Sequence, residues 1–192
     1  MKFFSDYLSV KPEKNLKLTG KLQIRPAVSE DIPCLASIKH SREGGRYETH
    51  LKCFQEEILK ADDKKLLIVA QIGEKIAGFA RAGYFFPPPN SPVSIAPEGW
   101  YLLGIIVSPE FRFCGVATEL TAFRLDFIAK YAATAYYFSN AKNLVSITLH
   151  KKFGFVEIGR NFTFPGVTFT GGRGILFRID LSSPDNFREG NF

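Results

Sequence analysis

The feature that most constrains this chain is an apolar run that passes through a short loop into a helical pattern, between residues 100 and 131. Residues 100–107 are almost entirely apolar, which predicts a buried strand, and Gly104 inside it is typical of a bulge or of a close approach by another backbone or ligand. After the loop, apolar side chains recur at helical spacing, at Val116, Leu120, Phe123, Phe127 and Ile128, which predicts a helix over about residues 115–131. A strand followed directly by a helix is typical of a mixed α/β fold.

The loop between this strand and this helix is suited to bind an anion. The first-turn amides of a helix have no intrahelical partner, and the helix dipole adds positive potential there. Gly115 lets a bulky group approach the backbone because it has no Cβ, Ala117 is nearly as small, and Arg112 adds charge. The loop contains neither Gly-Lys-Ser/Thr nor Gly-x-Gly-x-x-Gly, so a nucleoside triphosphate P-loop and a dinucleotide fingerprint are excluded. We therefore expect a different pyrophosphate ligand.

The same residues resemble motif A of the GNAT acetyltransferases, Val-x-Pro-x-x-Arg/Gln-x-x-Gly-x-Gly/Ala. The matching positions are Val107, Pro109, Arg112, Gly115 and Ala117. The resemblance covers about residues 22–181. It implies the GNAT fold, an acyl-coenzyme A ligand and an acyl-transfer reaction.

A second family motif, Asn-x-x-Ala-x-x-x-Tyr-x-x-x-Gly-Phe, is matched in part further along the chain. Asn143, Gly154 and Phe155 agree with it, whereas Ser146 and His150 replace its alanine and tyrosine. In the family this tyrosine usually gives a proton to the departing thiolate. His150 is the candidate acid here, because an imidazole with a pKa of about 6.5 can exchange a proton with a thiol of pKa about 8.5. The alternative is a histidine that faces solvent beside two lysines.

The resemblance also implies which residues hold the coenzyme A. The pantetheine arm would lie along the bulged strand like an added strand, and the pyrophosphate would rest on the amides of the loop, with Asn143 near the pantetheine. The implied residues are Ile105, Ile106, Val107, Arg112, Phe113, Cys114, Gly115, Val116, Ala117 and Asn143. A helix N-cap is the competing role of Asn143.

The general base is not identified by the resemblance. Many family members carry a glutamate six positions before the residue equivalent to Val107, where this chain has Tyr101. Glu98 and a water relayed through Tyr101 are the candidates. Positioning of a free amine beside the thioester can itself supply much of the rate.

Two variable segments are the candidates for the acceptor site. The first is the break between the first two expected helices, with Arg42, Gly44, Gly45, Arg46 and Tyr47. The second is the proline-rich segment 85–97, and Tyr84, Phe85 and Phe86 at its start could line an apolar slot. Surface and packing roles are the alternatives for both sets.

Periodicity along the rest of the chain predicts the element order βααβββαβαββ. Further strands are expected near residues 22–25, 66–72, 75–86, 135–138, 155–158 and 174–181, and further helices near 30–41, 48–60 and 142–152. Ser29 is the expected N-cap of the first helix. The order predicts a single α/β (α+β) domain with a mixed, mostly antiparallel sheet of about six to seven strands and helices on both faces. The expected divisions are an extension at 1–20, the acyltransferase domain at 21–182 and a tail at 183–192.

Charge and composition limit the classes of partner that the chain is expected to bind. The net charge of +6 favours anionic ligands, but the densest basic cluster, at residues 60–65, is interrupted by two aspartates, which is untypical of a nucleic-acid stripe. The three cysteines have no metal-like spacing and are expected to be free thiols. No apolar run approaches the roughly 18 residues that span a bilayer, and the first residues do not resemble a secretory signal. We expect a cytoplasmic protein with no metal and no nucleic-acid or membrane partner, and leave a homodimer open.

These observations favour an N-acetyltransferase. It would transfer an acetyl or related acyl group from acetyl-coenzyme A to a primary amine of a small molecule or protein, by direct attack in a ternary complex. A non-catalytic coenzyme A-binding sensor or scaffold is the main alternative, because the family's tyrosine and glutamate are missing. A nucleic-acid-binding module is supported by net charge alone.

Overall fold

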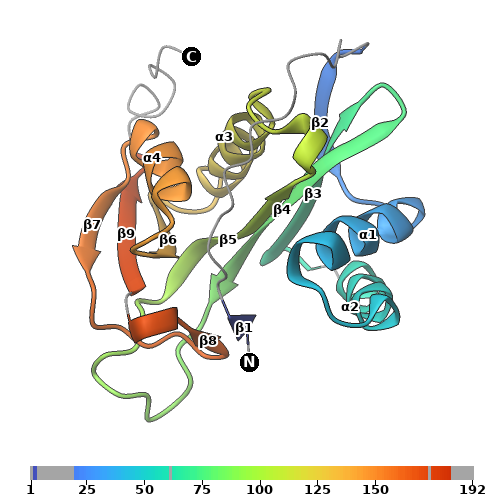
Figure 1. Cartoon of the computed structure of the whole chain (residues 1–192). Helices are drawn as coiled ribbons and strands as arrows, with labels where there is room; N and C mark the ends of the chain where they lie inside the picture. Colours follow the sequence, from blue (N-terminus) through green and yellow to red (C-terminus); the bar gives the residue numbers. More distant parts are fainter. Residues whose placement is uncertain (1, 4–19, 61, 173, 183–192) are drawn as a thin grey trace. The chain divides into compact units, whose positions relative to one another are not determined.

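The computed structural model describes residues 2–3, 20–60, 62–172 and 174–182 (Figure 1). Within these ranges the four helices are α1 Ile32–Glu43, α2 Tyr47–Leu59, α3 Val116–Ile128 and α4 Leu144–Lys152. The strands of the main sheet are β2 Leu22–Pro26, β3 Lys65–Ile72, β4 Lys75–Phe85, β5 Gly99–Val107, β6 Thr134–Asn140, β7 Val156–Gly159 and β9 Gly174–Asp180. The expected extension and tail lie almost wholly outside the described residues.

Shorter elements complete the described part of the chain. Three 3-10 turns, η1 Ser29–Asp31, η2 Pro109–Phe111 and η3 Thr170–Gly172, lie between the larger elements. Strands β1 Lys2–Phe3 and β8 Val167–Thr168 pair in parallel as a separate two-stranded sheet.

The seven main strands are hydrogen-bonded in the order β2-β3-β4-β5-β6-β9-β7. The pairs β2–β3, β6–β9 and β7–β9 are antiparallel, and β5–β6 is parallel. The predicted mixed, mostly antiparallel α/β fold is therefore confirmed, and the main elements follow the predicted order. Among the described residues, no helix is both long enough and apolar enough to cross a bilayer.

Two helix boundaries differ from the prediction for local reasons. Ser29 does not cap α1, because a 3-10 turn starts there and Asp31 is the residue that precedes the helix. Helix α3 ends at Ile128 rather than Tyr131. The amides of Lys130 and Tyr131 bond to carbonyls three residues earlier, so the last turn tightens out of α-helical geometry.

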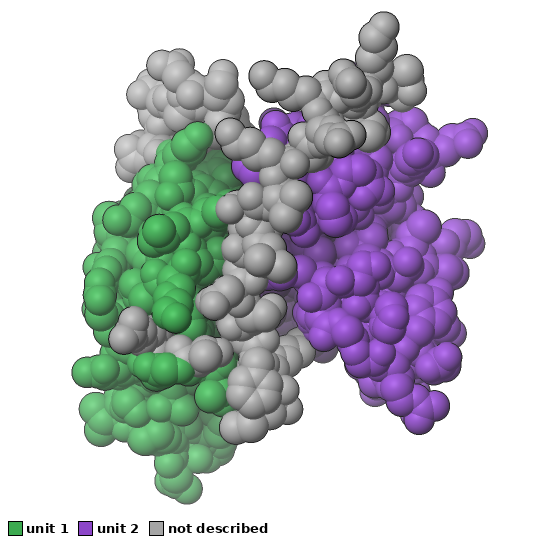
Figure 2. All heavy atoms as spheres, viewed as in Figure 1, with its two compact units in different colours: residues 1–8, 83–102, 125–192 green, residues 9–82, 103–124 purple. Residues whose placement is uncertain are grey.

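The chain divides into two compact units (Figure 2). Unit 1 comprises residues 1–8, 83–102 and 125–192, and unit 2 comprises residues 9–82 and 103–124. The boundaries fall within β4, β5 and α3, so these three elements contribute residues to both units.

Unit 2 has apolar clusters on both faces of β3. Ile68, Ala70 and Ile72 pack with residues of η2 and the start of α3. The alternate residue Val69 packs with residues of α1 and α2, including the fully buried Leu35 and Phe54. Full burial of an Ile, Val, Leu or Phe side chain in these clusters contributes roughly 1.5–3 kcal/mol to folding. The prediction of helices on both faces of the sheet is thus confirmed within unit 2.

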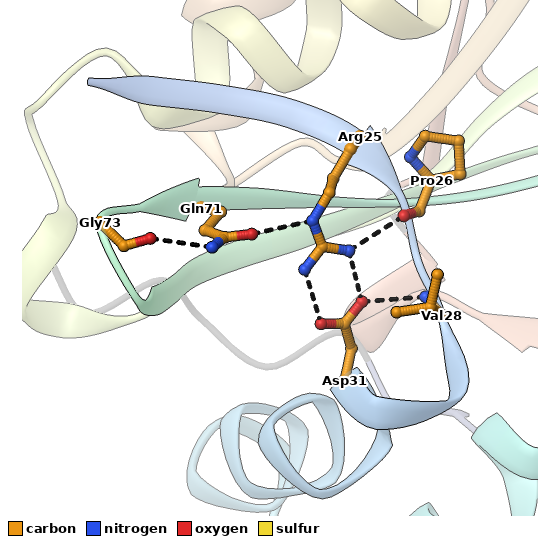
Figure 3. Close-up of polar contacts among 6 residues, drawn as sticks. All are labelled: Arg25, Pro26, Val28, Asp31, Gln71 and Gly73. Carbon is orange, nitrogen blue, oxygen red and sulfur yellow. Dashed lines mark hydrogen bonds and ion pairs between the residues drawn. The ribbon is translucent and has the colours of Figure 1, made fainter. Parts of the chain in front are cut away.

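A polar network joins the end of β2 to the turn that starts α1 (Figure 3). The Arg25 guanidinium donates to both carboxylate oxygens of Asp31, at 2.7 and 2.8 Å, and its Nε donates to Gln71 on β3 at 2.8 Å. The Val28 amide also donates to Asp31, at 2.9 Å. Burial alone raises the pKa of Asp31, but the bonds from Arg25 and Val28 outweigh it and lower the pKa overall.

Unit 1 is organised around β6. Its seven residues pair with β9 from Thr134↔Asp180 to Asn140↔Gly174, and β7 pairs with the other edge of β9. On its other side, β6 pairs in parallel with residues 100–102 of β5. The Tyr137 ring is parallel-stacked with Phe177, so β6 and β9 also pack through their side chains.

Candidate cofactor and active site

In unit 2, the loop that follows β5 is anchored at both ends. Ser108 donates its amide to the carbonyl of Ala77, at 2.9 Å, which attaches the end of β5 to β4. Phe111 in η2 and Val116 at the start of α3 are 2% and 1% exposed and pack in the same apolar cluster. The residues between these two anchors are therefore held as a short connection of defined geometry.

The middle of this loop is open to solvent. Phe113, Cys114 and Gly115 are exposed, and Phe113 and Gly115 have φ values of 63° and 78°. Among the described residues, no atom lies within 4 Å of a Cβ added to Gly115, although the φ there would strain any other residue. Open space beside an exposed backbone is the arrangement that a bulky anionic group requires.

The start of α3 supplies the hydrogen-bond donors. The Glu119 amide donates to the Gly115 carbonyl at 3.1 Å, so the amides of residues 116–118 precede the first bond of the helix ladder. Arg112 belongs to the same loop, and its Nε donates to the Val107 carbonyl at 3.5 Å. These groups fit a pyrophosphate, which needs several donors and positive potential at one place.

The strand before the loop has one open and one closely packed side. Gly104 is exposed, and in the part of the chain that the structure describes nothing lies within 4 Å of a Cβ added there, so none of the described backbone requires this glycine. At Gly78 on β4, by contrast, a Cβ would lie 2.5 Å from the Ile106 carbonyl oxygen. Gly78 therefore allows β4 to approach the strand residues expected to bind pantetheine. In the sequence, a glycine inside a predicted strand was the available indication of this close approach.

In unit 1, His150 is buried rather than facing solvent, so the solvent-facing alternative is wrong. The side chain is 1% exposed, because its ring stacks on Tyr137, with centroids 3.7 Å apart and planes 6° apart, and meets the edge of Phe155. Its Nδ1 lies 2.8 Å from the Ser146 carbonyl, which can only accept. The Nδ1 atom therefore carries a proton, and the other ring nitrogen, Nε2, is buried.

The two departures from the family's second motif contact the same side chain. Ser146 accepts a hydrogen bond from the Tyr137 hydroxyl at 2.7 Å, and His150 stacks on the Tyr137 ring. Asn143 takes the competing role expected for it, because its Oδ1 accepts the Ser146 amide at 3.2 Å and caps α4. Ser146 and His150 thus connect α4 to Tyr137 on β6, and Asn143 caps the start of the same helix.

Tyr101 lies in an aromatic cluster of unit 1 and is fully buried. The rings in contact with it are Phe85, Tyr136, Phe138 and Phe164. Its hydroxyl donates to the Pro97 carbonyl at 2.7 Å. Burial, with a smaller contribution from Tyr136, raises the pKa of Tyr101 well above its usual range. In this state the phenol is a packed hydrogen-bond donor.

Glu98, the other candidate base, is exposed and accepts a hydrogen bond from the Tyr84 hydroxyl at 3.0 Å. This bond is the main reason that the pKa of Tyr84 is raised. Tyr84 and Phe86 contact each other and Tyr84 meets the edge of Trp100, whereas Phe85 contacts Tyr101. The three neighbouring aromatic residues therefore do not line a single slot.

The expected break between the first two helices is present in unit 2. Gly44 and Gly45 have φ values of 68° and 82° and end α1. Arg46 is exposed and ion-paired with Glu48, and the Tyr47 hydroxyl bonds to the Pro33 carbonyl. Two histidines that the sequence reasoning did not single out also lie here.

These two histidines, His40 and His50, flank the glycine pair. Their rings are in edge contact, with centroids 6.1 Å apart, and His50 bonds to the Gly44 carbonyl at 2.8 Å. Their positions on either side of Gly44-Gly45 were the only sequence signal. They add ionisable groups to the segment predicted to face the acceptor.

The predicted site residues therefore form two groups. Those from Ile105 to Ala117 lie together in unit 2, on the end of β5, the loop and the start of α3. Glu98, Tyr101, Asn143 and His150 belong to unit 1. Among the described residues, no group of three or more His, Cys, Asp or Glu side chains could hold a metal ion. The three cysteines are exposed free thiols, as predicted.

Solved structures resemble this chain in fold. An N-acetyltransferase from Staphylococcus aureus Mu50 is 20% identical with a TM-score of 0.63, over 84% of this chain and 99% of that one. The ribosomal-protein-S18-alanine N-acetyltransferase from Escherichia coli is 21% identical with a TM-score of 0.60, over 85% and 96%. The protein yncA from Salmonella typhimurium, solved with its cofactor acetyl-CoA, is 15% identical with a TM-score of 0.62, over 85% and 98%.

Sequence comparison gives the family. No curated protein sequence matches the chain significantly. The profile of the Acetyltransferase (GNAT) family, however, matches residues 35–155, which is more than half of the chain and includes the whole of β5, the loop, α3 and α4. With this match, the chain belongs to the GNAT acetyltransferase family.

Proposed function

We propose that the chain transfers an acetyl group from acetyl-coenzyme A to a primary amine of a small molecule or a protein. Family membership supports acetyl transfer in general. The observation that carries the proposal is the exposed loop at Phe113–Gly115, next to the first amides of α3, where no atom of the described residues lies within 4 Å of a Cβ added to Gly115. This is the place where a coenzyme A pyrophosphate would gain charge-assisted hydrogen bonds.

In this proposal the backbone binds most of the coenzyme. Ile105, Ile106 and Val107 pair with the pantetheine amides, and the amides of residues 113–117 hold the pyrophosphate with help from Arg112. Phe113 and Cys114 contribute through their backbone, so their side chains need no particular chemistry. Asn143 holds the start of α4 through its cap rather than reaching the coenzyme.

The reaction would proceed by direct attack. The neutral amine nitrogen adds to the thioester carbonyl, the tetrahedral intermediate collapses, and the carbon–sulfur bond breaks to release a thiolate. His150, protonated on Nε2, gives its proton to that sulfur, while Nδ1 stays bonded to the Ser146 carbonyl. The amine's surplus proton passes through water to the exposed carboxylate of Glu98.

A second candidate function is a coenzyme A-binding sensor with little catalysis. The burial of Tyr101 and His150 favours it, because side chains packed among aromatic rings are common in a core. Both candidates require coenzyme A to bind. They differ only in whether thiol is released.

An amine panel separates the candidates. The chain is incubated with acetyl-coenzyme A and polyamines, amino acids, aminoglycosides or peptides with a free N-terminus, and free thiol is measured. Amine-dependent thiol release above the rate of thioester hydrolysis is expected. Binding without release for any amine would favour the sensor, and no rise in melting temperature with acetyl-coenzyme A would contradict both.

A further inference from the structure

Arg124 is fully buried in unit 2 and connects three of its elements. Its Nη1 donates to the Leu103 carbonyl on β5 at 2.9 Å and to the Arg81 carbonyl on β4 at 3.1 Å. Its Nε donates to the Leu120 carbonyl within α3, at 3.2 Å. Because the guanidinium is planar and rigid, these bonds hold the two strands and the helix at defined relative positions.

Thr121 extends this connection to the first turn of α3. The side chain is fully buried, and its hydroxyl accepts from Nη2 of Arg124 at 3.0 Å. The same hydroxyl donates to the Ala117 carbonyl at 2.8 Å. A continuous set of hydrogen bonds, made by two fully buried side chains, therefore runs from Ala117 through Thr121 and Arg124 to Leu103.

The two ends of this network lie at the two halves of the proposed coenzyme site. Ala117 belongs to the turn that would hold the pyrophosphate, and Leu103 lies two residues before Ile105, where pairing with pantetheine would begin. A ligand that contacts two elements at once gains the second contact fully only if their spacing already matches it. Buried, satisfied polar networks are a means of specifying one such arrangement.

We infer that Arg124 and Thr121 are positioning residues for coenzyme A. They set β5 relative to the first turn of α3, so that one molecule reaches both. The inference rests on the proposed function. Neither side chain is exposed, so each acts through the backbone groups that it holds and not by touching the ligand.

The test compares two ligands on the full chain. Coenzyme A contacts both halves of the proposed site, whereas adenosine 3′-phosphate 5′-diphosphate carries the pyrophosphate but no pantetheine. Thr121→Val keeps the shape of the side chain and removes the hydroxyl, and Thr121→Ser is the matched control that keeps it. Titration calorimetry should show coenzyme A affinity lowered about tenfold by Thr121→Val, with the nucleotide affinity changed by less than about twofold. Thr121→Ser should bind both ligands like the unaltered chain.

The outcomes separate positioning from simple stabilisation. Equal losses for both ligands, or unchanged coenzyme A affinity in Thr121→Val, would overturn the inference. Arg124→Met should produce the same selective loss more strongly, and if it does not fold, Thr121→Val alone decides. Failure of the unaltered chain to bind coenzyme A would instead overturn the proposed function and, with it, the inference.

Discussion

The loop at residues 107–117 and the surroundings of Tyr101 and His150 differ in what they leave accessible. In the loop, Phe113 to Gly115 are exposed and backbone groups are presented to solvent. Tyr101 and His150 are at most 1% exposed, and each packs against neighbouring aromatic rings. A site made of backbone groups requires no particular functional group on the side chains of Phe113 or Cys114, whereas catalysis needs particular side chains at particular atoms. The accessible backbone of the loop therefore favours cofactor binding there more directly than the buried side chains favour catalysis by Tyr101 or His150.

The largest expected effect tests whether His150, which is buried in unit 1, is catalytic. His150→Phe keeps a ring against Tyr137 and removes both nitrogens, so kcat should fall at least about a hundredfold if His150 is the acid. The affinity for acetyl-coenzyme A should stay nearly constant, as measured by titration calorimetry. Lys151→Gln, at an exposed neighbouring position, is the control. An unchanged kcat in His150→Phe would mean that His150 has a packing role only.

The next effect concerns the open loop. Gly115→Val places a branched side chain in free space at a φ of 78°, so it should weaken coenzyme A binding about thirtyfold by steric exclusion. Gly166→Val is matched to it, because Gly166 has a φ of 72° and open space but lies in unit 1. Both variants should lose similar stability in urea unfolding. Equal weakening of coenzyme A binding by both would contradict the assignment of the loop.

The third effect concerns the stability of unit 2 away from the loop. Asp31→Asn leaves Arg25 without its carboxylate partner and should lower the free energy of unfolding by about 2 kcal/mol. Urea unfolding measures this, and Asp62→Asn, at an exposed pair with Lys65, should change little. Equal effects of the two substitutions would show that burial of the Arg25 pair adds nothing.

The pH dependence of this effect has a defined sign. The pKa of Asp31 is lower in the folded chain than in the unfolded one, so its stabilisation is present above the unfolded pKa. It is lost as the pH falls through the folded pKa. Asp31→Asn should therefore flatten the acid side of the stability profile, and an acid limb as steep as that of the unaltered chain would contradict this.

The smallest effect distinguishes Tyr101 as a packing residue from Tyr101 as a proton relay. Tyr101→Phe removes only the hydroxyl that bonds to Pro97, so it should cost about 1 kcal/mol of stability. Steady-state kinetics should show kcat within about twofold of the unaltered chain, since about 0.4 kcal/mol corresponds to a factor of two. A loss of tenfold or more would place the hydroxyl in the reaction.

Features that depend on local chemistry could be predicted from the sequence. The start of α3 follows from Gly115 and the spacing of Val116 and Leu120, and the break after α1 follows from Gly44-Gly45. Contacts between distant residues could not be predicted. The bond of Tyr101 to Pro97, the tight approach at Gly78 and the Arg124 network depend on how strands and helices meet in space, which no pattern within one element specifies.

The prediction for His150 shows the same limit. Asn143 and His150 both fall in the helix expected near residues 142–152, but Asn143 caps that helix and the ring of His150 stacks on Tyr137. The hydrogen bond from Nδ1 to the Ser146 carbonyl fixes which nitrogen can exchange a proton. Only the fold could supply that information, because Tyr137 comes from a different element.

Amide hydrogen exchange with and without coenzyme A directly tests whether the coenzyme binds at the end of β5 and the loop that follows it. If the coenzyme binds as proposed, the amides of residues 113–118 and of Ile105 to Val107 should exchange more slowly when it is bound, because they donate to the ligand or are covered by it. Exchange in α1 and α2 should change much less. Coenzyme A binding that leaves residues 105–118 unchanged and protects another segment would contradict the account.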